Sequence, residues 1–407
     1  ATEGDPYLLA GQIEFADRAL LDRYLSAVQR VVDRHDILRT GFVWEGLRSP
    51  VQVVWRQAGL MVSEVNLDPS GGPCVEQLKQ RFDPRDYRIE LSEPPLLRFV
   101  IARDPHSDRW LVQMLQHHLI GDHSTLEVLQ EEVSGVLSGN EDELPLPEAF
   151  RNVVAQARMG ASQDEHEQYF RSVFNDIQEP VLPFGLDEVH GGGSGIREVR
   201  QQVPQEVNER LRAQARRLGV SLATLCHVAW AQVVGQTSAS VNAIFGTVLV
   251  GRMQAGVGAD RAMGVFINTL PLRLDLAGTV EEGVRQAHLR LAELLEHEHA
   301  SLALAQRCSG VAPGTPLFSA LLNYRHNAAR PASSSKGIKW LGGEERTNYP
   351  VALSVEDFET SMGLTAQVDE AVPAERVCGY MQQALANLAD ALERTPDLPL
   401  RQLDILP

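Results

Sequence analysis

The stretch LVQMLQHHLIGDHSTLEVLQEEV, residues 111–133, places three of the chain's 12 histidines within seven residues of one another. His117 and His118 are adjacent at the end of an apolar run. Asp122 follows four residues after His118, and His123 comes directly after it. Three explanations compete for this cluster: a metal site, a general base with its supporting residues, or a polar loop without chemistry.

The segments on either side of the cluster predict a strand and a helix. Residues 109–115 have a strand pattern and pair with residues 95–103 across the turn sequence DPHSD. Ser124 and Glu127 have the S-x-x-E spacing of a capping box. Apolar residues then continue on one helical face: Leu126, Leu129, Val133 and Leu137. The cluster is therefore expected on a strand-to-helix loop, where a rigid scaffold positions functional side chains.

A general base explains the cluster better than a metal does. A metal needs three or more converging ligands, but adjacent residues at a strand end, such as His117 and His118, point to opposite faces. A neutral imidazole with a pKa of about 6.5 can accept a proton from an attacking amine or hydroxyl. We therefore expect one histidine in a cleft, its neighbour packed inward, and Asp122 turned back to hold the loop. His297 and His299 lie two residues apart on a predicted helix, so they face different sides and are expected to be solvated.

The composition is that of an ordinary globular protein. Hydrophobic residues make up 43% of the 407 residues and charged residues 22%, which is enough for a sizeable core. The formal net charge of -17, without a basic stripe, argues against a nucleic-acid partner. No stretch approaches the roughly 20 apolar residues of a membrane span, and no signal peptide is visible. The four cysteines lie far apart without a C-x-x-C pair, so we expect buried thiols in a reducing cytoplasm.

Alternating strand and helix patterns predict an α/β protein with two lobes. A Gly- and Pro-rich break at residues 179–198 separates two α/β runs, and we place the boundary at residue 183. The N-terminal lobe, residues 1–183, carries the histidine cluster, and residues 184–407 form the C-terminal lobe. Besides those named above, strands are expected at 10–15, 38–44, 49–55, 196–203, 241–251, 268–276, 316–325, 350–357 and 363–369, and helices at 17–35, 205–219, 221–236, 279–298 and 374–394.

Five blocks along the chain resemble the motifs of one acyltransferase superfamily, which contains the condensation domains of nonribosomal peptide synthetases. HHLIGD (117–122) resembles the HHxxxD core of that family, and HDILRTGF (35–42) resembles its second motif. Three further blocks resemble later motifs: FGTVLVGRMQ…MGVFINTLPLRL (245–274), PLFSALLNYRHN (316–327) and YPVALSVED (349–357). Together the five blocks span nearly the whole chain.

The resemblance implies a fold, partners and a cellular setting. The fold is α/β, with two chloramphenicol-acetyltransferase-like lobes that form a V-shaped pseudo-dimer around a central tunnel. The 4′-phosphopantetheine arms of an upstream donor and a downstream acceptor carrier domain would enter from opposite sides, and an adenylation domain would be a neighbour. The chain would need no cofactor of its own and no metal, and it would work in the bacterial cytoplasm.

The first residues resemble part of a motif that marks dual epimerisation/condensation domains. In ATEGDPYLL, Gly4 and Asp5 match the final pair of H-H-(I/L)-x-x-x-x-G-D, whose two histidines would lie before Ala1. The chain therefore looks cut from a longer one, with an incomplete first strand region. One position departs from the common HHxxxDG core, because His123 stands where that core has Gly. Its side chain would occupy space that the family usually keeps free.

The resemblance also implies roles for individual residues. His118 takes the catalytic position, as a general base or as a group that positions the acceptor amine, and His117 packs inward beside it. Asp122, which belongs to the same motif, is expected to pair with an arginine; Arg39 is the first candidate and Arg252 the second. The residues expected to line the substrate tunnel are Gly121, His123, Asn323, Tyr324 and Ser354.

The predicted function is peptide-bond formation between a carrier-bound donor peptidyl thioester and a carrier-bound acceptor amino acid. It is preceded by L-to-D epimerisation of the last donor residue. Two alternatives stay open: an ordinary or acyl-initiating condensation domain without epimerisation, and a catalytically silent domain that recruits partners. The His118–Asp122 pair argues against the silent domain, because recruitment alone does not require it.

Overall fold

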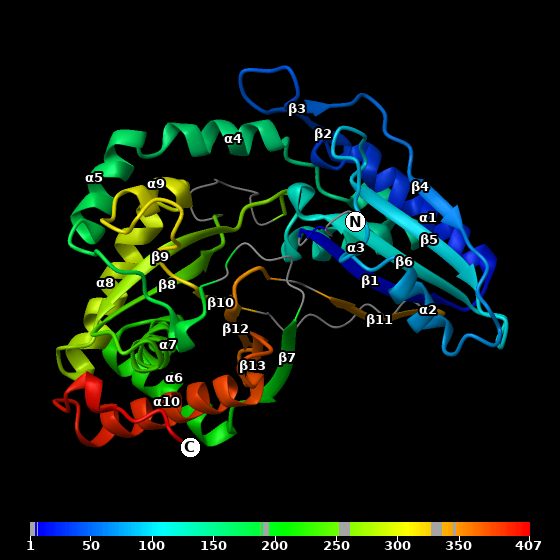
Figure 1. The fold of residues 1–407 in the computed structure, drawn as a ribbon. Helices are drawn as coiled ribbons and strands as arrows, with labels where there is room; N and C mark the ends of the chain where they lie inside the picture. Colours follow the sequence, from blue (N-terminus) through cyan, green and yellow to red (C-terminus); the bar gives the residue numbers. More distant parts are fainter. Residues whose placement is uncertain are drawn as a thin grey trace. The chain divides into compact units, whose positions relative to one another are not determined.

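The computed structural model describes residues 5, 7–187, 189, 195–251, 261–326, 336–344 and 347–407. The chain forms two compact units (Figure 1). Unit 1 comprises Ala1–Ala157, Arg252–Phe266 and Pro331–Arg346, and unit 2 comprises Arg158–Gly251, Ile267–Arg330 and Thr347–Pro407. Each unit combines a β-sheet with helices, so the predicted α/β class is confirmed.

Unit 1 is built on a five-stranded sheet with the order β11-β1-β6-β5-β4. Its strands are β1 (Leu8–Phe15), β4 (Met61–Glu64), β5 (Leu97–Arg103), β6 (Trp110–His117) and β11 (Ile338–Glu344). The predicted hairpin of β5 and β6 forms, and β1 pairs antiparallel with both β6 and β11. A separate two-stranded sheet contains β2 (Thr40–Val43) and β3 (Val51–Val54), the second strand pair that the sequence predicts.

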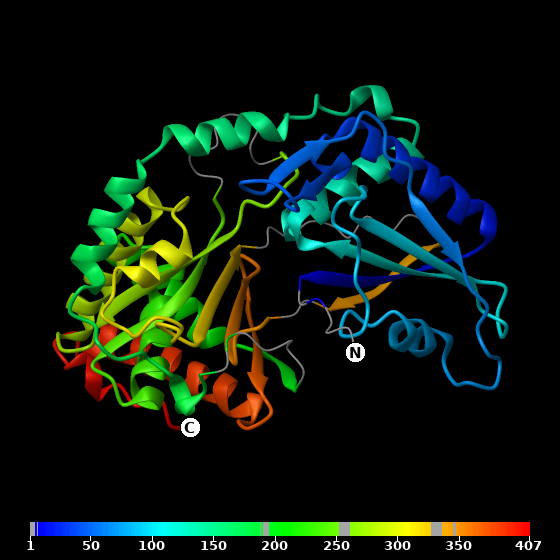
Figure 2. The ribbon, with the colours of Figure 1, turned by 45° about the horizontal axis from the view of Figure 1, so that its top comes forward.

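Helices cover both faces of this sheet, because its central strands are apolar on both sides. In β5, Phe99 and Ile101 belong to the core shared with α1 (Arg18–Arg34) and α3 (His123–Leu137). Val100 and Ala102 alternate with them and pack with α2 (Cys74–Arg81) on the other face. Figure 2 shows α1 and α3 on the opposite side of the sheet from α2. Asp17 caps α1 by accepting a hydrogen bond from Leu20 N. Short helical turns in this unit are η1 (Ile37–Arg39), η2 (His118–Ile120) and η3 (Glu141–Glu143).

Unit 2 is built on a six-stranded sheet with the order β7-β13-β12-β10-β8-β9. Its strands are β7 (Ile196–Gln202), β8 (Asn242–Leu249), β9 (Asn268–Asp275), β10 (Ala320–His326), β12 (Val351–Asp357) and β13 (Met362–Asp369). β10 lies between β8 and β12 and runs parallel to both. Figure 1 shows α7 and α10 close to the sheet, and residues of both helices belong to one core with the strands.

The helices of unit 2 are α5 (Gln163–Phe174), α6 (Gln205–Leu218), α7 (Leu222–Ser238), α8 (Val280–Glu296), α9 (Leu302–Arg307), α10 (Ala374–Arg394) and the turns η4 (Pro183–Gly185) and η5 (Leu400–Gln402). Among them, α6, α7, α8 and α10 lie where the sequence predicts helices. α4 (Phe150–Met159) spans the point where the chain leaves unit 1. Within the described ranges no single helix is long and apolar enough to cross a membrane, and α6 with α7 passes that test only as a pair bent by 112°.

The two units differ from the division predicted at residue 183. The chain passes from unit 1 to unit 2 after Ala157, and two later segments return to unit 1. One of these segments contains β11, which pairs with β1 from Ala10↔Glu344 to Phe15↔Ile338. A boundary placed from composition finds a change of local pattern, and it cannot detect a distant strand that completes a sheet. The sequence analysis also missed β4, α2, α4, α5, α9 and β11 itself.

Candidate functional site

The HHxxxD residues lie in unit 1 on the connection between β6 and α3, as predicted. β6 ends at His117, η2 begins at His118, and α3 begins at His123. The N-cap of α3 is Asp122, whose Oδ1 accepts a hydrogen bond from Thr125 N at 3.1 Å. The predicted capping box at Ser124 is therefore wrong. Asp caps a helix as well as Ser does, and the extended backbone of Asp122 (φ -104°, ψ -171°) has the conformation that an N-cap requires.

His117 packs inward, and both of its ring nitrogens are engaged. Nδ1 accepts a hydrogen bond from Leu119 N at 3.1 Å, and Nε2 lies 3.1 Å from Asp5 Oδ2. Because Nδ1 accepts, the proton of the neutral ring is on Nε2, which donates to the carboxylate. Burial lowers the pKa of His117 below its ordinary value, and the nearby Asp5 carboxylate opposes that shift. His117 thus has the geometry of a structural residue and not of a free base.

His118 is the histidine that stays available. Its main-chain N–H donates to Tyr7 O at 2.7 Å, which fixes the backbone at the start of η2. The side chain is half-buried, and its imidazole makes no hydrogen bond or ion pair with any described residue. A half-buried imidazole on a fixed backbone can accept or donate a proton to a bound molecule.

Asp122 braces the loop through main-chain groups. It is 2% exposed, and its Oδ2 accepts a hydrogen bond from Phe266 N at 3.2 Å while Oδ1 caps α3. Thr125 adds a second link to the same segment, because Gly264 N donates to Thr125 Oγ1 at 3.0 Å. The loop is therefore tied to residues 264–266, which follow in sequence more than a hundred positions later.

The predicted pairing of Asp122 with Arg39 is not formed. The guanidinium of Arg39 donates instead to the main-chain carbonyls of Trp55 and Arg56. Those carbonyls close the β2–β3 sheet, in which Thr40 pairs with Val54, so Arg39 holds the hairpin next to it. The second candidate, Arg252, lies outside the described residues, as does Gly4 of the N-terminal motif.

The two residues that flank Asp122 differ in the space around them. A Cβ on Gly121 would lie 2.5 Å and 2.6 Å from side-chain atoms of Thr125 and 3.0 Å from Gln116 Nε2, so the close packing of the loop requires glycine there. His123 is exposed as the first residue of α3, and its Nε2 lies 3.7 Å from Glu127 Oε1. Within unit 1, His123 therefore points toward solvent and Gly121 is buried.

The second predicted motif braces the same helix from behind. His35, at the C-cap of α1, is buried, and its Nε2 lies 2.9 Å from Glu132 Oε2 on α3. Arg34 Nε donates to the same oxygen at 3.1 Å. Burial alone raises the pKa of Glu132, but hydrogen bonds from His35 and Arg34 outweigh it and bring that pKa below its usual value. Sequence reasoning missed Glu132, which carries only the signal of an acidic residue on an otherwise apolar helical face.

The three polar residues predicted for the tunnel separate onto two faces of the unit 2 sheet. Asn323 and Ser354 are direct partners on the parallel strands β10 and β12, so their side chains share a face. The amide oxygen of Asn323, in its satisfied orientation, accepts from Arg325 Nε at 2.9 Å. Tyr324 lies between them in sequence and points to the opposite face, where it packs against the core that includes α7 and α10.

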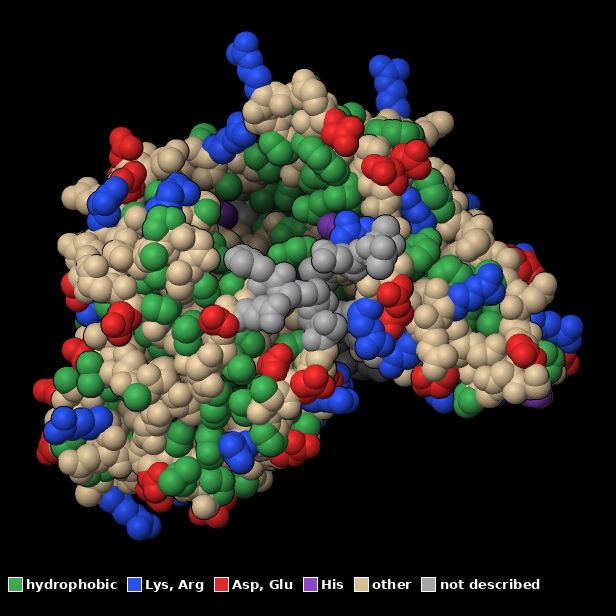
Figure 3. Space-filling model, viewed as in Figure 1, with side chains coloured by type: hydrophobic (Ala, Val, Ile, Leu, Met, Phe, Trp, Pro, Cys, Tyr) green, Lys and Arg blue, Asp and Glu red, His purple; other side chains and the backbone are tan. Residues whose placement is uncertain are grey.

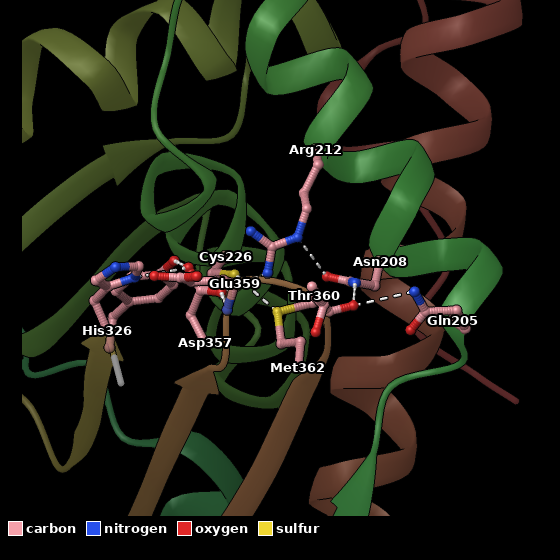
Figure 4. A network of polar contacts seen from close by, with 10 residues as sticks. Gln205, Asn208, Arg212, Cys226, His326, Asp357, Glu359, Thr360 and Met362 are labelled. Atoms are coloured by element: carbon pink, nitrogen blue, oxygen red, sulfur yellow. Dashed lines mark hydrogen bonds and ion pairs between the residues drawn. The ribbon is translucent and has the colours of Figure 1, made fainter. Parts of the chain in front are cut away.

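Tyr324 belongs to a polar network around Asp357, the last residue of β12 (Figure 4). Its hydroxyl donates to Asp357 Oδ2 at 2.6 Å, His326 Nδ1 lies 3.3 Å from the same oxygen, and Arg212 of α6 donates to Oδ1. Burial alone raises the pKa of Asp357, but these hydrogen bonds bring it below its ordinary value. Burial is the main cause that raises the pKa of the Tyr324 hydroxyl, and the Asp357 carboxylate adds to the shift. Tyr324 is therefore held as a neutral donor.

His297 and His299 are not solvated as predicted. Both are partly buried, and His297 Nδ1 lies 2.8 Å from His166 Nδ1 of α5. The ring of His297 also stacks on Tyr169, with centroids 4.1 Å apart. Burial lowers the pKa of both His166 and His297. α5, which was missed in the sequence, covers this helix end.

Charge and cysteine placement complete the description. On the face seen in Figure 3, acidic and basic side chains are interspersed, and they form no basic stripe among the described residues. In that part of the chain, no group of three or more His, Cys, Asp or Glu side chains is placed to hold a metal ion. All four cysteines are buried and free, as predicted.

Comparison with known proteins now adds to this geometry. The family model described as Condensation domain matches residues 2–407. The chain belongs to the condensation domain family of nonribosomal peptide synthetases. One of the five blocks that carried the resemblance, HHLIGD, forms the β6–α3 loop of this condensation domain, and that loop contains His117, His118 and Asp122.

Named relatives set the scale of the similarity. The condensation domain is 57% identical over 410 residues to malpibaldin synthetase of Mortierella alpina. The aligned region covers 100% of this chain and 7% of that protein. It is 54% identical over 407 residues to malpinin synthetase of the same organism, with 99% and 5% covered. The chain thus spans less than a tenth of these relatives. Both are fungal, so they give no support to the bacterial setting expected from the sequence.

A solved structure supports the fold. The first condensation domain of the CDA synthetase aligns with a TM-score of 0.75 and 17% identity, and the alignment covers 100% of this chain and 95% of that one. At this identity the likeness concerns the fold alone. It agrees with the α/β architecture expected of a condensation domain.

Several residues of the candidate site were not found from the sequence of this condensation domain. Thr125 and Phe266 hold Asp122, and Arg212 with Asp357 holds Tyr324. Thr125 could have been found as the third residue after an N-cap Asp. Phe266 contributes a main-chain N–H, which no side-chain pattern reveals.

Proposed function

We propose that this condensation domain forms an amide bond between a donor acyl thioester and the amine of an acceptor amino acid, each carried on the phosphopantetheine arm of a partner carrier domain. The observation that carries the proposal is the half-buried imidazole of His118, which has no partner among the described residues and stands on a turn fixed by the bonds of Leu119 N to His117 and of His118 N to Tyr7 O.

The chemistry needs one proton to move. The acceptor nitrogen attacks the thioester carbonyl carbon, a C–N bond forms, and the C–S bond breaks as the thiolate leaves. The nitrogen loses one proton and the departing sulfur gains one, so the reaction balances without an oxidant, a reductant or a metal. His118 is the residue that accepts the proton or orients the amine. The anchored main chain of His118 supports this role, because a general base must be held within hydrogen-bond reach.

We further propose that the domain inverts the last donor residue from L to D before condensation. Support comes from Gly4 and Asp5, which match the end of the motif of dual epimerisation/condensation domains. Inversion removes the proton from Cα next to the thioester carbonyl and returns one to the opposite face, so no cofactor is consumed. Both carrier domains and a neighbouring adenylation domain are the partners that this function requires, and the setting is cytoplasmic.

The function is tested with synthetic donors that end in an L or a D residue. Each is loaded as a thioester on a donor carrier domain and mixed with an aminoacyl acceptor carrier and this protein. Amide product from the D-terminated donor is the expected result, and no amide from either donor contradicts the condensation activity. Chiral analysis and Cα proton exchange in deuterated water report inversion. A product that keeps the L centre, with no exchange, contradicts the epimerisation and leaves ordinary condensation.

A further inference from the structure

We infer that Asp5 is a positioning residue for His118, and that it acts through His117. Its kinetic consequence rests on the proposed function. The inference starts from a contact between two sequence motifs: Asp5, from the N-terminal motif, is 112 positions away from His117 of the HHxxxD loop, and their side chains lie 3.1 Å apart.

The contact selects one tautomer of His117. The ring caps η2 by accepting from Leu119 N with Nδ1, which is possible only while Nδ1 carries no proton. The proton is then on Nε2, in a residue that is 3% exposed, and Asp5 Oδ2 is its acceptor. Without that acceptor the Nε2 tautomer buries an unsatisfied N–H, and the Nδ1 tautomer gives up the bond to Leu119. The first form carries the cost of a buried unsatisfied donor, which favours the second form, and in the second form the turn that contains His118 loses a support.

The segment around Asp5 is itself fixed. Asp5 N donates to Pro84 O at 2.9 Å, and Asp5 Oδ1 accepts from Tyr7 N at 3.0 Å. Tyr7 O in turn accepts from His118 N at 2.7 Å. Asp5 and Tyr7 therefore contact both histidines, one by its side chain and the other by its main chain. The two carboxylate oxygens of Asp5 therefore have different partners: Oδ1 closes the turn at Tyr7 N, and Oδ2 holds His117.

This division allows a sharp pair of variants. Asp5→Ser keeps a short oxygen for the turn at Tyr7 N but does not reach His117, because hydroxyls close such turns in the same way as carboxylates. Asp5→Ala removes both contacts. Asp17→Ala is the matched control, because Asp17 caps α1 of the same unit and has no contact with the loop. If Asp5 acts through His117, Asp5→Ser and Asp5→Ala share one defect that Asp17→Ala lacks.

The kinetic experiment measures kcat and KM with the D-terminated donor, which needs no inversion, and then with the L-terminated one. We expect kcat to fall by up to about 10²-fold in both Asp5 variants with both donors, since small misplacements of a reacting group have effects of this size. KM should change little. Combining Asp5→Ala with His117→Ala should lower kcat no further than His117→Ala alone. Wild-type kcat in Asp5→Ser, or a loss confined to the L-terminated donor, would overturn the inference.

A second measurement does not depend on activity. In protein labelled at the histidine ring nitrogens, the chemical shifts of His117, assigned with the His117→Ala variant, report its tautomer. The wild type and Asp17→Ala should show the Nε2–H form, and both Asp5 variants should show the Nδ1–H form or a mixture. An unchanged Nε2–H form in both Asp5 variants contradicts the inference. Inactive wild-type protein that shows the expected tautomers contradicts the proposed function and leaves the Asp5–His117 linkage standing.

Discussion

The His118 loop of unit 1 and the Asp357 network of unit 2 are both organised by a buried aspartate, but they use it differently. Asp122 accepts hydrogen bonds from the main-chain groups of Thr125 and Phe266. Asp357 accepts from the side chains of Arg212, Tyr324 and His326, and from one main-chain group, Glu359 N, at 3.0 Å. In the first case a backbone turn is fixed, and in the second case a set of side chains is joined.

The difference shows where chemistry can occur. The His117 ring and the Asp122 carboxylate hold the loop, and the imidazole of His118 is left without a partner among the described residues. Around Asp357 the Tyr324 hydroxyl and the Arg212 guanidinium are both bound to one carboxylate, so their hydrogen-bonding capacity serves stability. A buried carboxylate therefore marks a reactive site only where a neighbouring polar group remains unused.

The largest expected effect is on catalysis. His118→Ala should lower the rate of amide formation by about 10²- to 10⁴-fold, the usual range for a lost general acid–base group. The rate of product formation from carrier-bound substrates measures this. His106→Ala is the control, because His106 is exposed and its ring has a hydrogen bond to Pro69 O in a surface turn of unit 1, away from the β6–α3 loop in sequence. Amide formation at the wild-type rate in His118→Ala would contradict both the base and the positioning role. The His118 loop would then be no more reactive than the Asp357 network.

The Asp357 network should respond in stability. Asp357→Asn leaves the guanidinium of Arg212, whose side chain is 20% exposed, without its charged partner, and we expect a loss of about 3–5 kcal/mol in the free energy of unfolding. Urea titration, followed by the fluorescence of Trp230 in unit 2, measures this loss. Adding Arg212→Met should recover part of the loss, because the unpaired charge is gone. A loss below about 1 kcal/mol, similar to an exposed ion pair, would mean that the network is not a buried unit.

His227 is a histidine whose two ring nitrogens both have hydrogen-bond partners, in contrast to His118, so its titration should affect stability and not catalysis. It is buried in α7, with Nδ1 donating to Ala223 O and Nε2 accepting from Thr247 Oγ1, both at 2.7 Å. Burial lowers the pKa of His227 from 6.5 to about 4. The unfolded chain therefore binds a proton between these two pH values that the folded chain does not, so stability falls as the pH drops through this window.

The expected loss is about 3 kcal/mol between pH 6.5 and pH 4, and the contribution is constant above pH 6.5. Urea titrations across this range measure it, and the same series on His227→Asn supplies the control, since that side chain does not titrate. Equal pH slopes in both proteins would show that His227 is not the titrating group.

The smallest effect should be at Asp122. Asp122→Asn keeps one acceptor oxygen, and Asn is a good N-cap, so the cap on α3 should persist while the bond to Phe266 N is lost. A buried main-chain N–H without an acceptor costs about 1–3 kcal/mol, measurable by thermal melting. Activity should fall less than in His118→Ala. An unchanged melting temperature together with lost activity would mean that Asp122 acts on substrate, and the contrast with Asp357 would then have a different origin.

The sequence by itself determined the fold class, most elements and the position of the reactive loop. The helix predicted at 374–394 is α10 with the same bounds, and the hairpin of β5 and β6 leads into His117 as expected. These features depend on periodicity, capping and turn residues within about ten positions of one another, so the local pattern contains them. Side chains alternate between the two faces of a strand, so the neighbours Asn323 and Tyr324 must point to opposite faces. The prediction that both line the tunnel did not take this alternation into account.

Only the tertiary structure decided which distant groups meet. β11 completes the sheet of unit 1 by pairing with β1, and Phe266 reaches Asp122 across 144 positions. Arg39 holds the β2–β3 sheet instead of Asp122, and Asp5 joins His117. Such partners are main-chain groups, or side chains whose alternatives look equivalent in sequence, and only the packing of segments far apart in the chain brings one of them within hydrogen-bond distance. The order of residues therefore identified the reactive histidine, and the fold supplied the groups that hold it.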